Sequence, residues 1–213
     1  MNIIETKLQF SGLRSRSTTK LIVLHHSASP DVSAAQIHGW HLALGWAGIG
    51  YHFVIRKNGV IERGRPLGTI GAHAGAGVNG HSIGICLNGN FMQESPSPMQ
   101  IKSLLELINW LNKQYVSSTG ASLDIKLHHQ VSPTQCPGVL FPTAGEVKKM
   151  VLAMSTGEEG DIVDAWKIKI MEDAKKAGLI LDEHQPDDPA PKWFVLTVAL
   201  RVLEIIREEK GAY

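Results

Sequence analysis

Short apolar runs of strand length alternate with amphipathic helical patterns along residues 1–154. The pair Asn58-Gly59 stands between two of these runs and predicts a hairpin, because a type I′ turn needs a positive φ at both central residues. The segment Ser33–Gln36 has the pattern of a capping box and predicts the start of a helix. Strands and helices mixed in this way predict an α/β or α+β domain, in which helices cover the faces of a sheet. The expected strands are residues 21–24, 51–55, 59–62, 82–87 and 123–127, and the expected helices are residues 33–44, 99–115 and 146–154.

The charge of the chain is unevenly distributed. Residues 1–154 hold 13 Lys and Arg against 7 Asp and Glu, a net charge of +6, whereas residues 155–213 hold 8 against 13, a net charge of −5. A basic body favours an anionic partner, either a nucleic acid or an acidic polymer such as a cell wall. The basic residues are scattered, without a Lys/Arg run or interleaved aromatic residues, and we therefore expect no nucleic acid as a partner.

Membrane insertion and a disulfide-rich fold are both disfavoured by the sequence. No window approaches the roughly 18 uninterrupted apolar residues of a transmembrane helix. The first 20 residues lack the apolar segment of a secretory signal. Two cysteines, Cys86 and Cys136, are too few for a disulfide scaffold. Cys86 lies within an apolar run and is expected to be a small buried hydrophobic residue.

Histidine pairs follow two of the expected strands directly. His25-His26 comes after the first run, His128-His129 comes after the last, and Cys136 lies eight residues beyond His128. Strand ends present side chains to a common cleft, and two imidazoles with one thiolate can form a three-ligand zinc site. The spacing alone leaves an alternative open, in which the cysteine is a buried hydrophobic residue and the histidines are ordinary surface or core residues.

Five short segments follow one another along residues 20–154. They are LIVLHHSAS, GW at residue 46, GIGYHFVI, GAHA with HSIGICLNGNF, and LHHQVSPTQCPG. In this order they resemble the zinc-dependent N-acetylmuramoyl-L-alanine amidases, the superfamily of phage amidase-type lysozymes and peptidoglycan recognition proteins. The resemblance implies the fold of that superfamily, a mixed central β-sheet flanked by helices, with Zn²⁺ as a cofactor in a surface cleft.

The same resemblance implies a ligand set. The zinc ligands fall on His25, His128 and Cys136 of this sequence. Neighbouring residues of a strand point to opposite faces, so we do not expect His25 and His26 both to bind the ion. His26 and His129 are interpreted as residues of the pocket wall or as supports of the ligands.

Other site residues also follow from the resemblance. Tyr51 lies where the family has an active-site tyrosine, whose hydroxyl can orient water or stabilise the tetrahedral intermediate. Thr134 lies where some phage members have a lysine; its hydroxyl can donate one hydrogen bond but carries no charge. His73 and His81 are candidates for substrate binding, with a structural role as the alternative. Trp40 and Trp46 are expected to pack in the core or in the cleft wall rather than to bind sugar.

The function implied is hydrolysis of the amide between N-acetylmuramic acid and L-alanine, with peptidoglycan as the partner. We expect a phage or prophage endolysin that stays in the host bacterial cytoplasm until its release and then acts on the cell wall. Two alternatives stay open: a bacterial autolysin or cytoplasmic muropeptide-recycling amidase, and a peptidoglycan-binding protein without hydrolysis. Cys136 favours an enzyme, because non-catalytic recognition proteins usually lack the cysteine ligand.

The acidic end of the chain is expected to form a small all-α appendage. Residues 155–160 have the small polar composition of a linker, and apolar residues recur at helical spacing in residues 162–177 and 192–209. Residues 161–213 are interpreted as a helical C-terminal module. Modular phage lysins often carry a cell-wall-targeting module at this end. The alternative is a helical pair that stabilises the body or forms a homo-oligomer.

Overall fold

The structure is a computed structural model that describes residues 1–119, 122–156, 175, 178 and 180. The chain divides into two compact units, Met1–Thr156 and Gly157–Tyr213. Apart from Lys175, the helices expected in residues 162–177 and 192–209 lie outside the described residues. Of the expected linker, residues 155 and 156 are described, and both belong to the last helix of the first unit.

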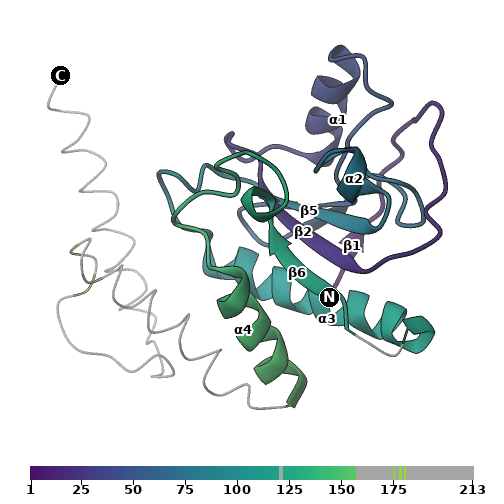
Figure 1. The fold of residues 1–213 in the computed structure, drawn as a ribbon. Coiled ribbons are helices and arrows are strands. Elements are labelled where there is room, and N and C mark those ends of the chain that lie inside the picture. The colour runs from purple at the N-terminus through teal and green to yellow at the C-terminus, as the bar shows by residue number, and fades with distance from the viewer. Residues whose placement is uncertain (120–121, 157–174, 176–177, 179, 181–213) are drawn as a thin grey trace, which may run out of the picture. The chain divides into compact units, whose positions relative to one another are not determined.

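A six-stranded mixed sheet forms the centre of the first unit (Figure 1). Its spatial order is β1-β4-β3-β5-β2-β6, in which β3 and β4 are antiparallel and every other neighbouring pair is parallel. The strands are β1 (Ile3–Ile4), β2 (Leu21–His26), β3 (Phe53–Ile55), β4 (Ile61–Arg63), β5 (Ser82–Leu87) and β6 (Asp124–Leu127). This arrangement confirms the predicted mixed sheet with flanking helices.

Helices cover both faces of the sheet. In Figure 1, α1 and α2 lie on one side, and α3 and α4 lie on the other. The helix α3 packs against α4 and β3, and α4 also packs against β6. The helices are α1 (Ala34–Ala43), α2 (Ala76–Asn79), α3 (Pro98–Thr119) and α4 (Ala144–Thr156), and a 3₁₀ turn, η1 (His128–Gln130), follows β6.

The central strands are buried on both faces. All six residues of β5 are buried, and five of the six in β2 are buried. A parallel strand covered by helices on both sides is apolar throughout, which explains the uninterrupted apolar runs of the sequence. One face of these strands carries Leu21, Val23 and then His25 at the end of β2, so the strand that builds the core also delivers a polar side chain to its edge.

Local signals in the sequence correctly predict a hairpin and a helix cap. The expected hairpin joins β3 to β4, but the expected type I′ turn is wrong, because Gly59 has a φ of +82° and Asn58 has no positive φ. The Gly59 N–H donates to the carbonyl of Arg56 (2.9 Å), so the turn is centred one residue earlier and Gly59 follows it. Ser33 caps α1 in a reciprocal capping box with Gln36. Three elements were not expected, β1, α2 and the 3₁₀ turn η1, because segments of two, four and three residues are too short to show a periodic pattern.

Within the described residues, no helix has both the length and the apolar character that crossing a membrane requires.

Candidate metal centre and active site

Three side chains from distant segments meet at one edge of the sheet. His25 lies near the end of β2, His128 begins η1, and Cys136 lies in the loop that follows. Each offers one ligand atom, and these atoms all lie within 4.8 Å of one another. The imidazole rings of His25 and His128 are 4.3 Å apart between centroids, and Nδ1 of His25 lies 3.8 Å from Sγ of Cys136.

The register of two parallel strands brings the histidines together. Leu24 of β2 pairs with Leu127 of β6, and each leucine is followed by the histidine of the cluster. Because carboxyl ends of parallel strands meet at the same edge of a sheet, His25 and His128 are neighbours there, although about half of the chain lies between them.

The loop that carries Cys136 is tied back to the same histidine segment. The His129 N–H donates to the carbonyl of Cys136 (2.9 Å), and the Ser132 N–H donates to the carbonyl of His128 (3.0 Å). The N–H of His26 donates to Sγ of Cys136 (3.3 Å). The backbone bonds therefore hold the cysteine segment beside His128 and His129, and the third bond places the thiol beside β2.

The second histidine of each pair points elsewhere. Nδ1 of His26 accepts the N–H of Phe91 (3.1 Å), on the side of the strand away from His25. His129 is exposed, and its backbone rather than its ring contacts the cysteine segment. The alternation of side chains along β2 thus separates His25 from His26, as the sequence predicts.

Burial shifts the pKa of each side chain in the cluster toward its neutral form. Burial lowers the pKa of His25 well below its usual value, and the neighbouring His128 lowers it further. Burial also lowers the pKa of His128, so both rings are neutral bases at neutral pH. Burial raises the pKa of the Cys136 thiol to about 11. Two imidazole nitrogens and one sulfur at these distances fit Zn²⁺, whose protein ligands are His and Cys side chains.

Tyr51 stands next to the cluster, just before β3. Its ring lies 5.1 Å from that of His25 and 5.7 Å from that of His41. Burial raises the pKa of its hydroxyl well above the usual value, with smaller contributions from Cys86 and Cys136. The phenol therefore keeps its proton at neutral pH and can act as a hydrogen-bond donor.

Thr134 lies on the exposed side of the cysteine loop. Its Oγ1 accepts the backbone N–H of Cys136 (3.2 Å). Since a hydroxyl both accepts and donates, its hydrogen remains available to a group outside the loop.

The two candidate substrate-binding histidines occupy different places. His73 is only 7% exposed, and its Nδ1 lies 3.0 Å from Nε2 of His25. His81 directly precedes β5, and its carbonyl accepts the N–H of Lys20 at the start of β2. His81 thus lies at the opposite end of these parallel strands from His25.

Two tryptophans contribute to the surface rather than to the core. Trp40 is 47% exposed and Trp46 is 44% exposed. The ring of Trp46 contacts that of His41 in a tilted arrangement, with centroids 4.6 Å apart, and His41 in turn contacts Tyr51. The expected core packing does not hold for either residue, while the position of Trp46 agrees with a cleft wall.

Three further histidines have a role that the sequence did not indicate. Nδ1 of His38, His41 and His52 accepts a backbone N–H, from Ile49, Gly50 and Gly84 at 3.2, 3.0 and 3.0 Å. A buried donor without such an acceptor destabilises the fold. These rings therefore hold the segment around Tyr51 in place and account for part of the high histidine content.

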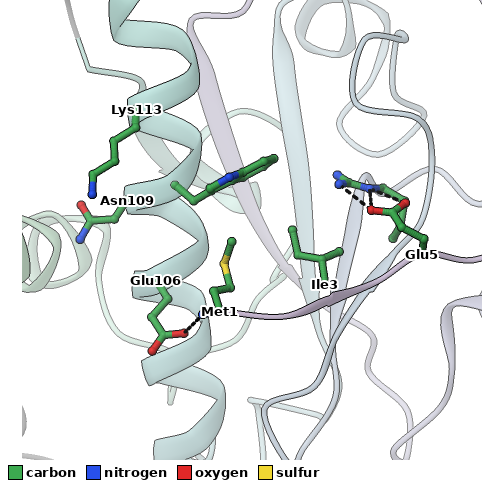
Figure 2. A pocket seen from close by; sticks show the side chains of 8 residues that line it. Met1, Ile3, Glu5, Glu106, Asn109 and Lys113 are labelled. Carbon is green, nitrogen blue, oxygen red and sulfur yellow. Dashed lines mark hydrogen bonds and ion pairs between the residues drawn. The ribbon is translucent and has the colours of Figure 1, made fainter.

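A separate hollow lies between β1 and α3, away from the cluster (Figure 2). Its volume is about 650 Å³. Arg63 is paired with Glu5 (3.1 Å), and the amino group of Met1 faces Glu106 (4.0 Å). The first pair joins the segment after β1 to β4, and the second joins the N-terminus to α3. The hollow is lined by Met1, Ile3, Glu5, Arg63, Glu106, Asn109, Trp110 and Lys113.

Residues 15–139 match the N-acetylmuramoyl-L-alanine amidase family. The endolysin of Enterobacteria phage T3 is 37% identical over 139 residues, which cover 62% of this chain and 86% of the endolysin. The structure of the N-acetylmuramoyl-L-alanine amidase LysC from Clostridium intestinale is similar with a TM-score of 0.64 and 36% identity, covering 70% of this chain and 96% of LysC. The structure of wild-type Drosophila PGRP-LB is similar with a TM-score of 0.57 and 27% identity, covering 64% of this chain and 88% of that protein.

The matched residues contain the whole His/Cys cluster, Tyr51 and Thr134, on the fold that these relatives share. The chain therefore belongs to the N-acetylmuramoyl-L-alanine amidase family.

Proposed function

We propose that this peptidoglycan amidase hydrolyses the amide between the lactyl group of N-acetylmuramic acid and L-alanine, with Zn²⁺ held by His25, His128 and Cys136. The observation that carries the proposal is the convergence of these three ligand atoms within 4.8 Å. When bound, the ion supplies Lewis-acid chemistry, which polarises a carbonyl and makes water a stronger nucleophile at neutral pH. Two neutral imidazoles and one thiolate would leave the ion with a net positive charge, which favours this role.

Tyr51 is the proposed hydrogen-bond donor to the reacting amide. Its hydroxyl stays protonated because burial raises its pKa. A donor placed beside the cluster stabilises the negative charge that develops on the carbonyl oxygen during hydrolysis, and a single preorganised donor of this kind contributes about 10²–10³ in rate.

Thr134 is proposed to assist from the loop that carries Cys136. Its oxygen holds the Cys136 N–H, so the side chain is already oriented, and its hydrogen can be donated to substrate. A neutral donor stabilises developing charge less than a lysine would, and we expect a smaller contribution than that of Tyr51.

His73 and His81 remain candidates for substrate contact. The small exposed fraction of His73 and its contact with His25 favour a supporting role, developed below. His81 directly precedes β5, at the end of this strand that is far from His25. A substrate contact at His81 would therefore be remote from the bond that is cut.

The similarity to phage endolysins supports a lytic enzyme that acts on the cell wall. We infer that the protein is held in the host cytoplasm until release, and that residues 161–213 assist its binding to the wall. A muropeptide-recycling amidase or a peptidoglycan-binding protein without hydrolysis is less consistent with endolysin relatives and with the cysteine of the cluster.

Mass spectrometry of digested sacculi identifies the bond that the enzyme cleaves. We expect free stem peptides that begin with L-alanine, together with uncut glycan strands. New glycan ends or cleavage within the stem peptide would contradict the proposal. In parallel, chelation should abolish the clearing of sacculi and added Zn²⁺ should restore it.

A further inference from the structure

The side chain of His73 packs into a space that is open because two nearby glycines have no side chain. Its ring lies over Gly84 of β5 and beside Gly71. A Cβ atom at Gly84 would come within 2.6 Å of the ring, and one at Gly71 within 2.5 Å. The backbone at this point is fixed as well, because Oδ1 of Asn79 accepts the N–H groups of His73 and Ala74 at 3.0 and 2.9 Å. The imidazole is therefore held in one place over β5, against His25 of β2.

A chain of hydrogen bonds runs from His25 through this ring to a backbone carbonyl. Nε2 of His25 lies 3.0 Å from Nδ1 of His73, and Nε2 of His73 lies 3.4 Å from Oγ of Ser82. The Ser82 hydroxyl donates to the carbonyl of Val78 (2.8 Å). His25, His73 and Ser82 are each buried, at 0%, 7% and 0% exposure.

The carbonyl of Val78, the last acceptor, determines which atom donates in each hydrogen bond of this series. A carbonyl oxygen can only accept, so the Ser82 proton is committed to Val78 and the Ser82 oxygen is left to accept from Nε2 of His73. Nδ1 of His73 then carries a lone pair, and it can only accept from Nε2–H of His25. His25 is left with its lone pair on Nδ1, the atom that faces Sγ of Cys136 at 3.8 Å.

We infer that His73 is a positioning residue, which through Ser82 holds His25 in the tautomer whose Nδ1 lone pair is directed into the His/Cys cluster. This inference rests on the proposed function, because it assigns His25 as a ligand. Ligating histidines generally donate their second ring N–H to a fixed acceptor, and loss of that acceptor typically weakens metal binding 10–100-fold. Here a neutral imidazole takes the place of the more common carboxylate or carbonyl.

Two nearly isosteric substitutions separate hydrogen bonding from packing. In His73→Asn, the amide oxygen can occupy the place of Nδ1 and still accept from His25, whereas His73→Leu fills similar space without an acceptor. Zinc affinity of the full chain is measured by competition with a chromophoric chelator. We expect His73→Leu to bind Zn²⁺ 10–100-fold more weakly than wild type and His73→Asn to lie within about 3-fold of it. Equal affinities for all three chains, or equal losses in both variants, would overturn the inference.

A second readout is independent of the metal. In the metal-free chain, the ¹⁵N resonances of His25 report which ring nitrogen is protonated. We expect the Nε2-protonated form in wild type and in His73→Asn, and a mixture of both tautomers in His73→Leu. An unchanged His25 spectrum in His73→Leu would contradict the role of His73 even if this variant binds zinc more weakly. A wild-type chain that binds no zinc would instead overturn the proposed function, and the inference with it.

Discussion

Nδ1 of His25 lies 3.8 Å from Sγ of Cys136, although 111 positions separate the two residues in the chain. His25 is placed by β2, an inner strand of the sheet next to the edge strand β6, and Cys136 is placed by a loop whose backbone bonds return to His128 and His129. The pairing of β2 with β6 places the end of β2 beside His128 and so brings the strand and the loop together. The cluster is therefore a product of strand register rather than of any local motif.

Removal of one proposed ligand should abolish catalysis without unfolding the domain. We expect His128→Gln and Cys136→Ser each to lower amidase activity by several orders of magnitude and to reduce bound zinc below one ion per chain, since a three-ligand site loses a donor. The neighbouring His129→Gln is the matched control, because this ring is exposed. Metal analysis and muropeptide turnover check this, and substantial turnover in Cys136→Ser would place the third ligand elsewhere.

Tyr51→Phe removes one hydroxyl and leaves the ring. We expect kcat to fall about 100-fold with little change in KM, because the lost donor acts on charge that develops during the reaction. Zinc content should equal that of wild type, which separates this effect from loss of the ion. A variant with normal kcat would limit Tyr51 to packing.

The stability of the fold should decrease in acid through its buried histidines. Burial and the nearby Arg16 lower the pKa of His52 from 6.5 to about 3, and its Nδ1 must stay unprotonated to accept the Gly84 N–H. Between these pH values the unfolded chain binds a proton that the folded chain excludes. The contribution of His52 is thus fully present above about pH 6.5 and is lost as the pH falls toward about 3, by up to about 1.4 kcal/mol per pH unit.

Urea unfolding at pH 7, 6, 5 and 4 measures this effect. In His52→Asn, whose amide oxygen can accept the same N–H, we expect a smaller decrease of the unfolding free energy with falling pH than in wild type. The same slope in both chains would exclude His52 as a source of the acid sensitivity.

Glu62 anchors the helix that precedes the tyrosine segment. Its carboxylate, only 9% exposed, accepts the N–H of Ala34 at the first turn of α1 and pairs with Arg56 (3.1 Å). We expect Glu62→Gln to lower the unfolding free energy by about 1–3 kcal/mol, because a charge-assisted buried bond is lost. Glu5→Gln is the control, since Glu5 is 67% exposed and surface pairs contribute about 0–1 kcal/mol. Equal, small effects would mean that α1 does not depend on Glu62.

A chain ending at Thr156 tests the proposed C-terminal module. The first unit, Met1–Thr156, is compact by itself. We expect the truncated chain to hydrolyse soluble muropeptides at the wild-type rate and to bind intact sacculi more weakly in a sedimentation assay. Unchanged binding to sacculi would favour a role in stabilisation or in homo-oligomer formation.

The elements that follow from local chemistry could be predicted from the sequence. The capping box at Ser33 and the hairpin at Asn58-Gly59 depend on residues adjacent in the chain, and both occur, although the turn is not the expected type I′. The buried strands were visible because burial on both faces requires unbroken apolar runs. The order of histidines and cysteine, together with the family resemblance, predicted the three residues that the fold brings together.

What only the tertiary structure decided is the environment of each histidine. The sequence left His73 between substrate binding and a structural role, and it did not indicate that His38, His41 and His52 accept backbone N–H groups. Each role depends on which ring nitrogen contacts a partner from another element. It also depends on whether the fold leaves space for the ring, as it does above Gly84. Residue order determines periodicity and turns, because these are interactions between near neighbours. Strand register and packing determine contacts between distant side chains, and these contacts fix the tautomer of a neutral imidazole.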